Sequence, residues 1–297
     1  MAEIIVRNRK DVSSLLDRLK TSWQLAKESF RILMLDKELL LFPLLSGILL
    51  VFVIITYIFP LFIGKSASVM FQPHAPIYYT WTILIFYFLS YFVIIFFNVA
   101  LISCVSIRLK GRDPTFTDGI RNAFRNIHKI ALWALISATV GIIINYIERR
   151  FEKFGRIIAS LFGIAWSLAT FFVVPVMIFE HGNLLESLKK SAQLFKKTWG
   201  ESVAGEFGIG AFFGLLSAIC IAGFISTIWI IVFGHVSPIL ILPLTLFFAI
   251  ALFILIPMIS SALNGIYITA LYTYATTKKV PKGFSAEFIK NAYAKKV

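Results

Sequence analysis

Six long apolar stretches constrain the fold of this chain more than any other feature of its sequence. A transmembrane helix needs about 20 apolar residues to cross about 30 Å of hydrocarbon. Of the 297 residues, 59% are hydrophobic, whereas a soluble domain has about 45–50%. The sequence therefore predicts an all-α, polytopic membrane helix bundle with six spans. We expect these spans at Leu39–Ile63, Trp81–Ile107, Ile130–Ile147, Ile157–Phe179, Val203–Phe233 and Ile239–Tyr274.

The distribution of Lys and Arg predicts how these spans are oriented. If the spans alternate in direction, 24 of the 29 Lys and Arg residues fall on one side of the membrane and five on the other. Positively charged loops tend to remain in the cytoplasm. We therefore expect a multi-pass protein of the cell membrane with both termini cytoplasmic. The net charge of +14 is then mostly a topology signal, and we expect no nucleic-acid partner.

Basic amphipathic segments recur on the expected cytoplasmic side. Residues 183–200 place apolar side chains every three to four positions and lysines on the opposite face, and Asn183 with Glu186 has the form of a capping box. Similar segments precede the first span and follow the second and sixth. We therefore expect three hairpin repeats, of about residues 11–110, 114–182 and 183–282. The predicted organisation is a basic arm over 1–38, a transmembrane domain over 39–282 and a basic amphipathic helix over 283–297.

The amphipathic pattern also predicts which side chains of two segments face inward. In the 183–200 segment these are Leu184, Leu188, Ala192, Phe195 and Trp199, and after the second span they are Phe116, Ile120, Phe124 and Ile127. The opposite faces can direct positive charge to lipid phosphates. The expected headgroup-binding residues are Lys189, Lys190, Lys196, Lys197, Arg121 and Arg125. The expected partners are the lipid bilayer and anionic phospholipid, and a homo-oligomer is left open.

Polar and small residues inside the spans are the other candidates. Polar side chains in hydrocarbon are costly and are often functional. A polar path could include Glu206, Asn98, Asn264 and Asn145, but an interfacial ion pair for the glutamate and interhelical hydrogen bonds for the asparagines are open alternatives. Small residues in a row let another helix approach closely. The expected helix-packing positions are Gly210, Gly214, Ala218 and Gly163.

One stretch carries a resemblance to known proteins. The sequence PVMIFEHGNLLESLKKSAQLFKKTWG resembles a pattern in a broad family of uncharacterised six-span prokaryotic membrane proteins, and SWQLAKESFRILMLDKELLLFPLLS looks like the opening segment of that family. The membrane region ahead of some bacterial glycerophosphodiester phosphodiesterase domains is also similar. The resemblance implies an architecture and no activity.

The sequence contains no recognisable catalytic constellation. It lacks the HExxH and GxSxG patterns and a phosphate-binding Gly-Lys loop, and its four histidines have no metal-ligand spacing. We therefore expect no enzymatic activity, no cofactor and no metal site. The favoured function is a channel or transporter-like protein for a small solute or ion. The alternative is a membrane scaffold or anionic-lipid-binding assembly protein.

Overall fold

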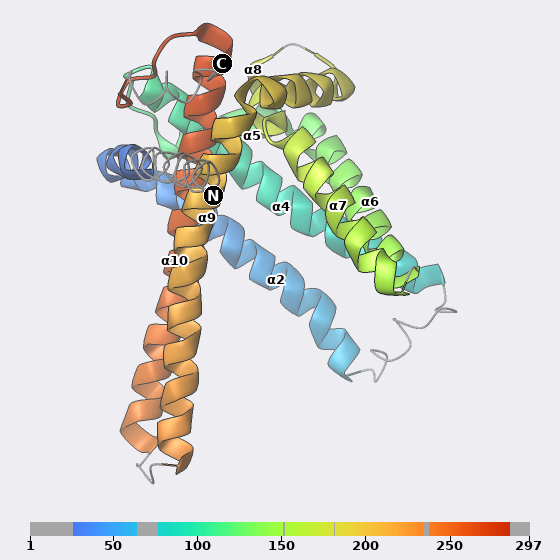
Figure 1. The fold of residues 1–297 in the computed structure, drawn as a ribbon, viewed down its shortest axis with the longest axis vertical. Coiled ribbons are helices and arrows are strands. Elements are labelled where there is room, and N and C mark those ends of the chain that lie inside the picture. Colours follow the sequence, from blue (N-terminus) through green and yellow to red (C-terminus); the bar gives the residue numbers. More distant parts are fainter. Residues whose placement is uncertain (1–25, 64–76, 151, 181, 234–237, 286–297) are drawn as a thin grey trace, which may run out of the picture. The chain divides into compact units, whose positions relative to one another are not determined.

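The structure is a computed structural model that describes residues 26–63, 77–150, 152–180, 182–233 and 238–285 (Figure 1). The described residues form helices joined by short turns, without a β-strand among them. Their contacts divide the chain into two compact units. We call Leu41–Lys197 the central unit, and Met1–Leu40 together with Thr198–Val297 the terminal unit. The predicted all-α fold is confirmed for this part of the chain.

The six predicted spans are also confirmed. Six helical segments are long and apolar enough to cross a membrane, namely Lys37–Tyr57, Trp81–Leu109, Ile127–Glu148, Phe154–Phe179, Phe212–Ile231 and Ile241–Thr277. Each overlaps one predicted span. The protein is therefore a multi-pass membrane protein in its architecture.

The central unit is organised around one helix, α4 (Ile77–Leu109). This helix contacts α2 (Leu41–Ile63), α5 (Phe116–Arg125), α6 (Ile127–Arg150) and α8 (Val173–Phe179). A second contact joins α6 to α7 (Glu152–Thr170), which follows it as the other arm of a hairpin (Figure 1). A long central helix thus holds the other elements of this unit together.

The buried core of the central unit gathers in the C-terminal half of α4. Val99, Ala100 and Val105 of that half have no exposed surface. Towards the other end, large apolar side chains lie open on the surface, such as Phe52 of α2 at 68% exposure and Trp81 of α4 at 59%. Open apolar surface on a spanning helix is suited to lipid, so this half of the unit matches a membrane environment.

Two spans differ from their predicted extents. The fourth is broken, because α7 ends at Thr170 and the chain resumes as α8 at Val173. The fifth lies within a longer helix than predicted, because α9 (Leu184–Phe233) runs without interruption through the basic segment and the apolar span. No proline lies between Leu184 and Phe233. The backbone hydrogen bonds of the helix can therefore continue past the point at which one helix was expected to end and the next to begin.

The terminal unit packs its N-terminal helix near the end of α10 (Pro238–Thr277). Residues 26–35 are helical, and the short helix η1 (Lys37–Leu40) contacts α10. After α10, the backbone N–H of Ser285 donates a hydrogen bond to Glu28 Oε1 at 3.3 Å. The N-terminal helix and the segment after α10 therefore touch. Residues 1–25 and 286–297, which include most of the predicted basic arms, lie outside the described residues.

Candidate functional site

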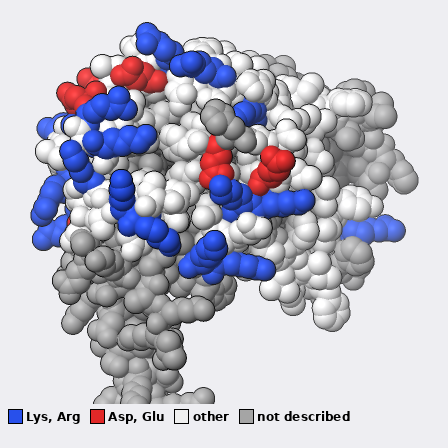
Figure 2. Space-filling view, turned by 90° about the horizontal axis from the view of Figure 1, so that it is seen from above, with Lys and Arg blue, Asp and Glu red and all other residues white. Residues whose placement is uncertain are grey.

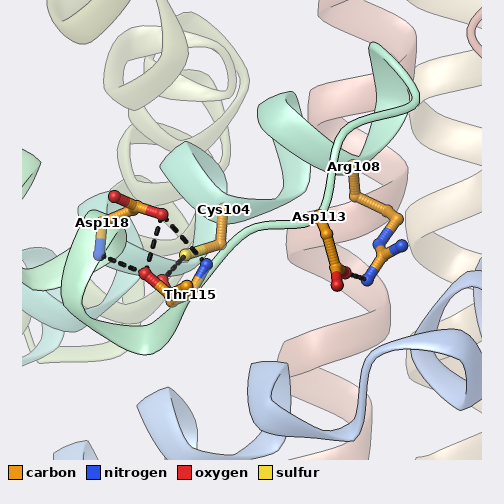
Figure 3. A network of polar contacts seen from close by, with 5 residues as sticks. All are labelled: Cys104, Arg108, Asp113, Thr115 and Asp118. Carbon is orange, nitrogen blue, oxygen red and sulfur yellow. Dashed lines mark hydrogen bonds and ion pairs between the residues drawn. The ribbon is translucent and has the colours of Figure 1, made fainter.

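The turn between α4 and α5 is fixed by a dense set of polar contacts (Figure 3). Arg108 at the end of α4 pairs with Asp113. Thr115 and Asp118 form a capping box: the Asp118 N–H donates to Thr115 Oγ1 at 3.3 Å, and the Thr115 N–H donates to Asp118 Oδ2 at 3.0 Å. The buried Cys104 thiol donates to the Thr115 carbonyl at 3.4 Å. These contacts set the position at which α5 begins.

The capping box also affects the ionisation of Asp118. Its pKa is lowered, first by the hydrogen bond from the Thr115 hydroxyl and then by that from the Thr115 backbone. The positive charges of Arg121 and Arg112 lower the pKa further. This carboxylate is therefore engaged in closing the N-terminus of α5.

Helix α5 packs against α4 through its small residues. A Cβ atom on Gly119 would lie 2.7 Å from Cys104 Sγ and 2.8 Å from the Ala100 carbonyl oxygen. Ala123, one turn later, is fully buried. The Asn122 amide donates to Ser103 Oγ at 2.7 Å. The two helices are therefore in close contact along the Gly119 face.

The predicted inward face of α5 is only partly correct. Phe116 stacks on Phe42 of α2 with ring centroids 5.0 Å apart, as an inward residue should. Phe124 is 58% exposed and Ile127 is 40% exposed, although both were expected to face inward. Because the Gly119 and Ala123 side of α5 packs against α4, Phe124 is displaced to the surface. Ile127 lies beyond α5, as the first residue of α6.

The first turns of α9 pack against the break between α7 and α8. Ser191 is fully buried, and its hydroxyl accepts from the Phe172 N–H at 3.0 Å and donates to the Ala169 carbonyl at 2.7 Å. The ring of Phe195, which is buried as predicted, lies 5.8 Å from that of Phe171. Sequence reasoning missed Ser191. The available signal was its place on the predicted apolar face, three residues after Leu188 and four before Phe195.

Two lysines in this region hold elements of the central unit together. Lys190, predicted as a headgroup-binding residue, pairs with Glu180 just after α8. The Lys129 ammonium group of α6 donates to the Met177 carbonyl of α8 at 3.0 Å. The expected capping box at the start of α9 is present in part, because the Asn183 N–H donates to Glu186 Oε2 at 3.0 Å. These contacts restrain α8 against its neighbours.

The remaining predicted headgroup residues lie on the surface. Lys189, Lys196, Lys197, Arg121 and Arg125 are exposed, and their side chains form no hydrogen bond or ion pair with a described residue. The same holds for the side chains of Lys110 and Arg112 in the turn after α4. Figure 2 shows a face on which blue Lys and Arg side chains are scattered among a few red acidic ones. This part of the central unit therefore presents positive charge to its surroundings.

The four acidic residues described on the same elements are already engaged. Asp113 pairs with Arg108 and Glu180 with Lys190. Asp118 caps α5, and Glu186 accepts from the Asn183 N–H. Each of these acids therefore already has an internal contact, and none forms an ion pair with the other exposed cations of the same described segments. We call this excess of exposed positive charge over exposed unengaged acids the imbalance of charge on the described surface.

The candidate polar path is only partly visible. The Asn145 amide of α6 lies 3.5 Å from the Tyr87 hydroxyl of α4, and Asn98 on α4 is partly buried. Asn264 belongs to the terminal unit, where its Oδ1 is buried and has no hydrogen-bond partner among the described residues. Glu206 lies in α9, but its side chain falls outside the part of the chain that is described.

The expected small-residue contacts have different outcomes in α7 and α9. A Cβ atom on Gly163 of α7 would lie 4.0 Å from Ile144 of α6, so that glycine faces the neighbouring helix. Gly210 and Gly214 have no neighbouring atom within 4 Å of such a Cβ, and Ala218 is exposed. No described helix therefore packs against the small residues Gly210, Gly214 and Ala218 of α9.

A family match covers most of the described helices. The model of a family of unknown function, DUF6159, matches residues 77–283, which is more than two thirds of the chain. The protein belongs to this family. The match agrees with the predicted resemblance to an uncharacterised membrane family, whereas the similarity to the region ahead of phosphodiesterase domains stays a prediction. No curated protein and no solved structure matches the chain significantly.

Proposed function

We propose that this protein is a non-enzymatic membrane scaffold that binds anionic phospholipid through the basic surface of its central unit. The observation that supports the proposal is the imbalance of charge just described. Arg121, Arg125, Lys189, Lys196 and Lys197 are exposed and form no side-chain hydrogen bond or ion pair with a described residue, whereas the acids of the same elements are engaged in internal contacts. Such a surface attracts an anion.

The apolar residues beside these cations favour a membrane surface over a soluble anion. Phe124 and Ile127 are exposed beside Arg125, and Leu185 is 63% exposed one turn before Lys189. Side chains that mix exposed apolar groups with positive charge suit the boundary between acyl chains and headgroups. The proposal also places both termini in the cytoplasm, because that leaflet carries the anionic lipid.

The test compares lipid binding by the full-length protein and two variants in native mass spectrometry. Phosphatidylglycerol should bind more tightly than phosphatidylcholine. Changing Lys189, Lys196 and Lys197 to Gln should weaken phosphatidylglycerol binding by about fivefold per lysine, since each contributes about 1 kcal/mol at an anionic surface. Lys190 is left unchanged because it pairs with Glu180.

The matched control is Arg156→Gln near the start of α7. Arg156 is an exposed cation, and it lies 3.7 Å from Glu148 in an ion pair. Its replacement should leave phosphatidylglycerol binding unchanged, because the charge split of the sequence assigns it to the opposite side of the membrane. Equal affinity of the unmodified protein for the two lipids would overturn the proposal.

A second candidate function, transport of a small solute or ion, has one observation in its favour. Tyr87, Tyr91 and Asn98 are spaced four and seven residues apart on α4, which puts them on one face of that helix. Asn145 approaches Tyr87 from α6. In proteoliposomes, Asn145→Ala should lower solute flux below that of the unmodified protein. Flux no higher than in empty liposomes for the unmodified protein would exclude this function.

A further inference from the structure

The contacts of α5 with α4 locate the boundary of the bilayer along the central unit. Gly119 lies against Ala100 and Cys104, and the ring of Phe124 lies 5.1 Å from that of Phe96. Helix α5 therefore crosses α4 well before the end of α4 at Leu109. Phe96 is 13 residues from that end, or about 20 Å at 1.5 Å per residue.

The charges of α5 cannot lie in hydrocarbon, so this crossing marks the membrane surface. Arg125 follows Phe124 directly and is exposed. A guanidinium group remains at the headgroups while its methylene groups cover apolar surface. Arg125 therefore lies at the headgroup level on this side of the central unit, and the exposed ring of Phe124 lies beside it at the acyl boundary.

Two arginines of α5 lie together at this level. Arg121 and Arg125 are one helical turn apart, and residues at this spacing are neighbours on the helix surface. Asp118, three residues before Arg121, accepts hydrogen bonds from the Thr115 hydroxyl and N–H and also feels the positive charge of Arg121. Neither guanidinium group forms an ion pair with a described carboxylate, so both remain available to an outside anion.

The N-terminus of α5 is closed to an outside anion. The Asp118 N–H already donates to Thr115 Oγ1, and the Thr115 N–H already donates to Asp118 Oδ2. An anion at α5 must instead be held by side chains. Guanidinium groups bind phosphate oxygens through paired, charge-assisted hydrogen bonds, which an ammonium group cannot reproduce.

We infer that Arg121 and Arg125 hold the phosphate of an anionic glycerophospholipid, whose acyl chains lie against the exposed ring of Phe124. This inference rests on the proposed function, since it names the site at which that lipid is bound. It assigns the saturable site to the arginines of α5. The lysines of α9 then contribute a general attraction that falls with salt.

The decisive variant changes the arginine chemistry and keeps the charge. In native mass spectrometry of the full-length protein, Arg121→Lys with Arg125→Lys should weaken phosphatidylglycerol binding about tenfold, the scale of one lost charge-assisted hydrogen bond. The positive charge that directs topology is unchanged by this replacement. Arg112→Lys is the matched control in the preceding turn, and it should bind as the unmodified protein does.

A second variant tests the apolar half of the site. Phe124→Ala should also weaken phosphatidylglycerol binding and leave the thermal unfolding midpoint close to that of the unmodified protein, because the ring is 58% exposed. Inorganic phosphate in excess should not displace the lipid. Displacement by inorganic phosphate would show a free-anion site and overturn the lipid assignment.

The outcomes separate this inference from the proposed function. If the double Lys variant binds phosphatidylglycerol as tightly as the unmodified protein, the α5 site is wrong and general electrostatic binding survives. If the unmodified protein shows no preference for phosphatidylglycerol over phosphatidylcholine, both fail. Loss of binding in the Gln variant of the α9 lysines, with full binding in the double Lys variant, would place the site on α9.

Discussion

The side chain of Ser191 takes the place of the helical hydrogen bond that the backbone N–H of Phe172 lacks. The acceptor Oγ of Ser191 lies 3.0 Å from that nitrogen, and the hydroxyl donates to the Ala169 carbonyl at 2.7 Å. A broken spanning helix needs partners for its freed backbone groups. The basic segment at the start of α9 therefore stabilises the break in the fourth span, in addition to carrying charge.

Replacing Ser191 with Ala should destabilise the protein. Ser191 is fully buried, so the variant leaves the Phe172 N–H and the Ala169 carbonyl without their partner. The expected loss is about 1–3 kcal/mol in the free energy of unfolding. Thermal unfolding in detergent measures it. The control is Ser226→Ala, because the exposed Ser226 bonds only to Ala222 of its own helix and its loss should be near zero.

Gly119→Ala should also destabilise the protein, for a steric reason. The added Cβ would lie 2.7 Å from Cys104 Sγ and 2.7 Å from Phe42 Cζ, so α5 must move away from α4. Overpacking of this kind costs about 1–3 kcal/mol. Gly47→Ala in α2 meets no atom within 4 Å and should raise stability by about 0.5–1 kcal/mol. Equal unfolding midpoints for the two variants would contradict the close α4–α5 contact.

The number and positions of the spans could be predicted from the sequence because hydrocarbon imposes a strong requirement. Each span must be long, apolar and internally hydrogen-bonded, and these features are local. Pro175 gave a local signal for a break in the fourth span, because a proline lacks a backbone N–H and clashes with the carbonyl four residues before it. The partner of the Phe172 N–H could not be predicted in the same way, because Ser191 is 19 residues away and lies on a different helix. The sequence likewise predicted two helices near Gly200, where the structure has the single helix α9.

The inward faces of the amphipathic helices were predicted less well, for a related reason. A stripe of large apolar residues indicates the buried face when a helix lies on lipid or on a broad core. When a helix packs closely on another helix, small residues are buried instead. Gly119 and Ala123 of α5 and Ser191 of α9 are buried in this way, and Phe124 is displaced to the surface.

Gly214 of α9 should tolerate a large side chain. Its small-residue row predicted a close helix contact, but no atom lies within 4 Å of a Cβ at this position. Gly214→Leu should therefore keep or raise the thermal unfolding midpoint, because Leu is a better helix former by about 0.5–1 kcal/mol. A fall in the midpoint of more than a few degrees would indicate a neighbour for this face, such as a second copy of the chain.

Acid should weaken the start of α5. The pKa of Asp118 lies below its ordinary value of 3.8, because Thr115 donates two hydrogen bonds to the carboxylate. A lowered folded-state pKa contributes stability above the ordinary value, and this contribution is lost as the pH falls through the lowered pKa. Unfolding midpoints of the unmodified protein and Asp118→Asn should differ at neutral pH and converge below pH 3.8. A constant difference across this range would exclude the capping carboxylate as its source.

Labelling of introduced cysteines should place Arg150 and Lys279 on opposite sides of the membrane. Both residues are exposed, and the charge split of the sequence assigns Lys279 to the side with 24 Lys and Arg residues and Arg150 to the side with five. Cys220 is replaced by Ala in the background, and the buried Cys104 is retained for its contact with Thr115. In intact cells, a membrane-impermeant maleimide should label Arg150→Cys, whereas Lys279→Cys should require permeabilisation because the C-terminal side is cytoplasmic. The unsubstituted background measures labelling of Cys104. Labelling of both introduced cysteines in intact cells would contradict the predicted topology and with it the assignment of the basic surface to the anionic leaflet.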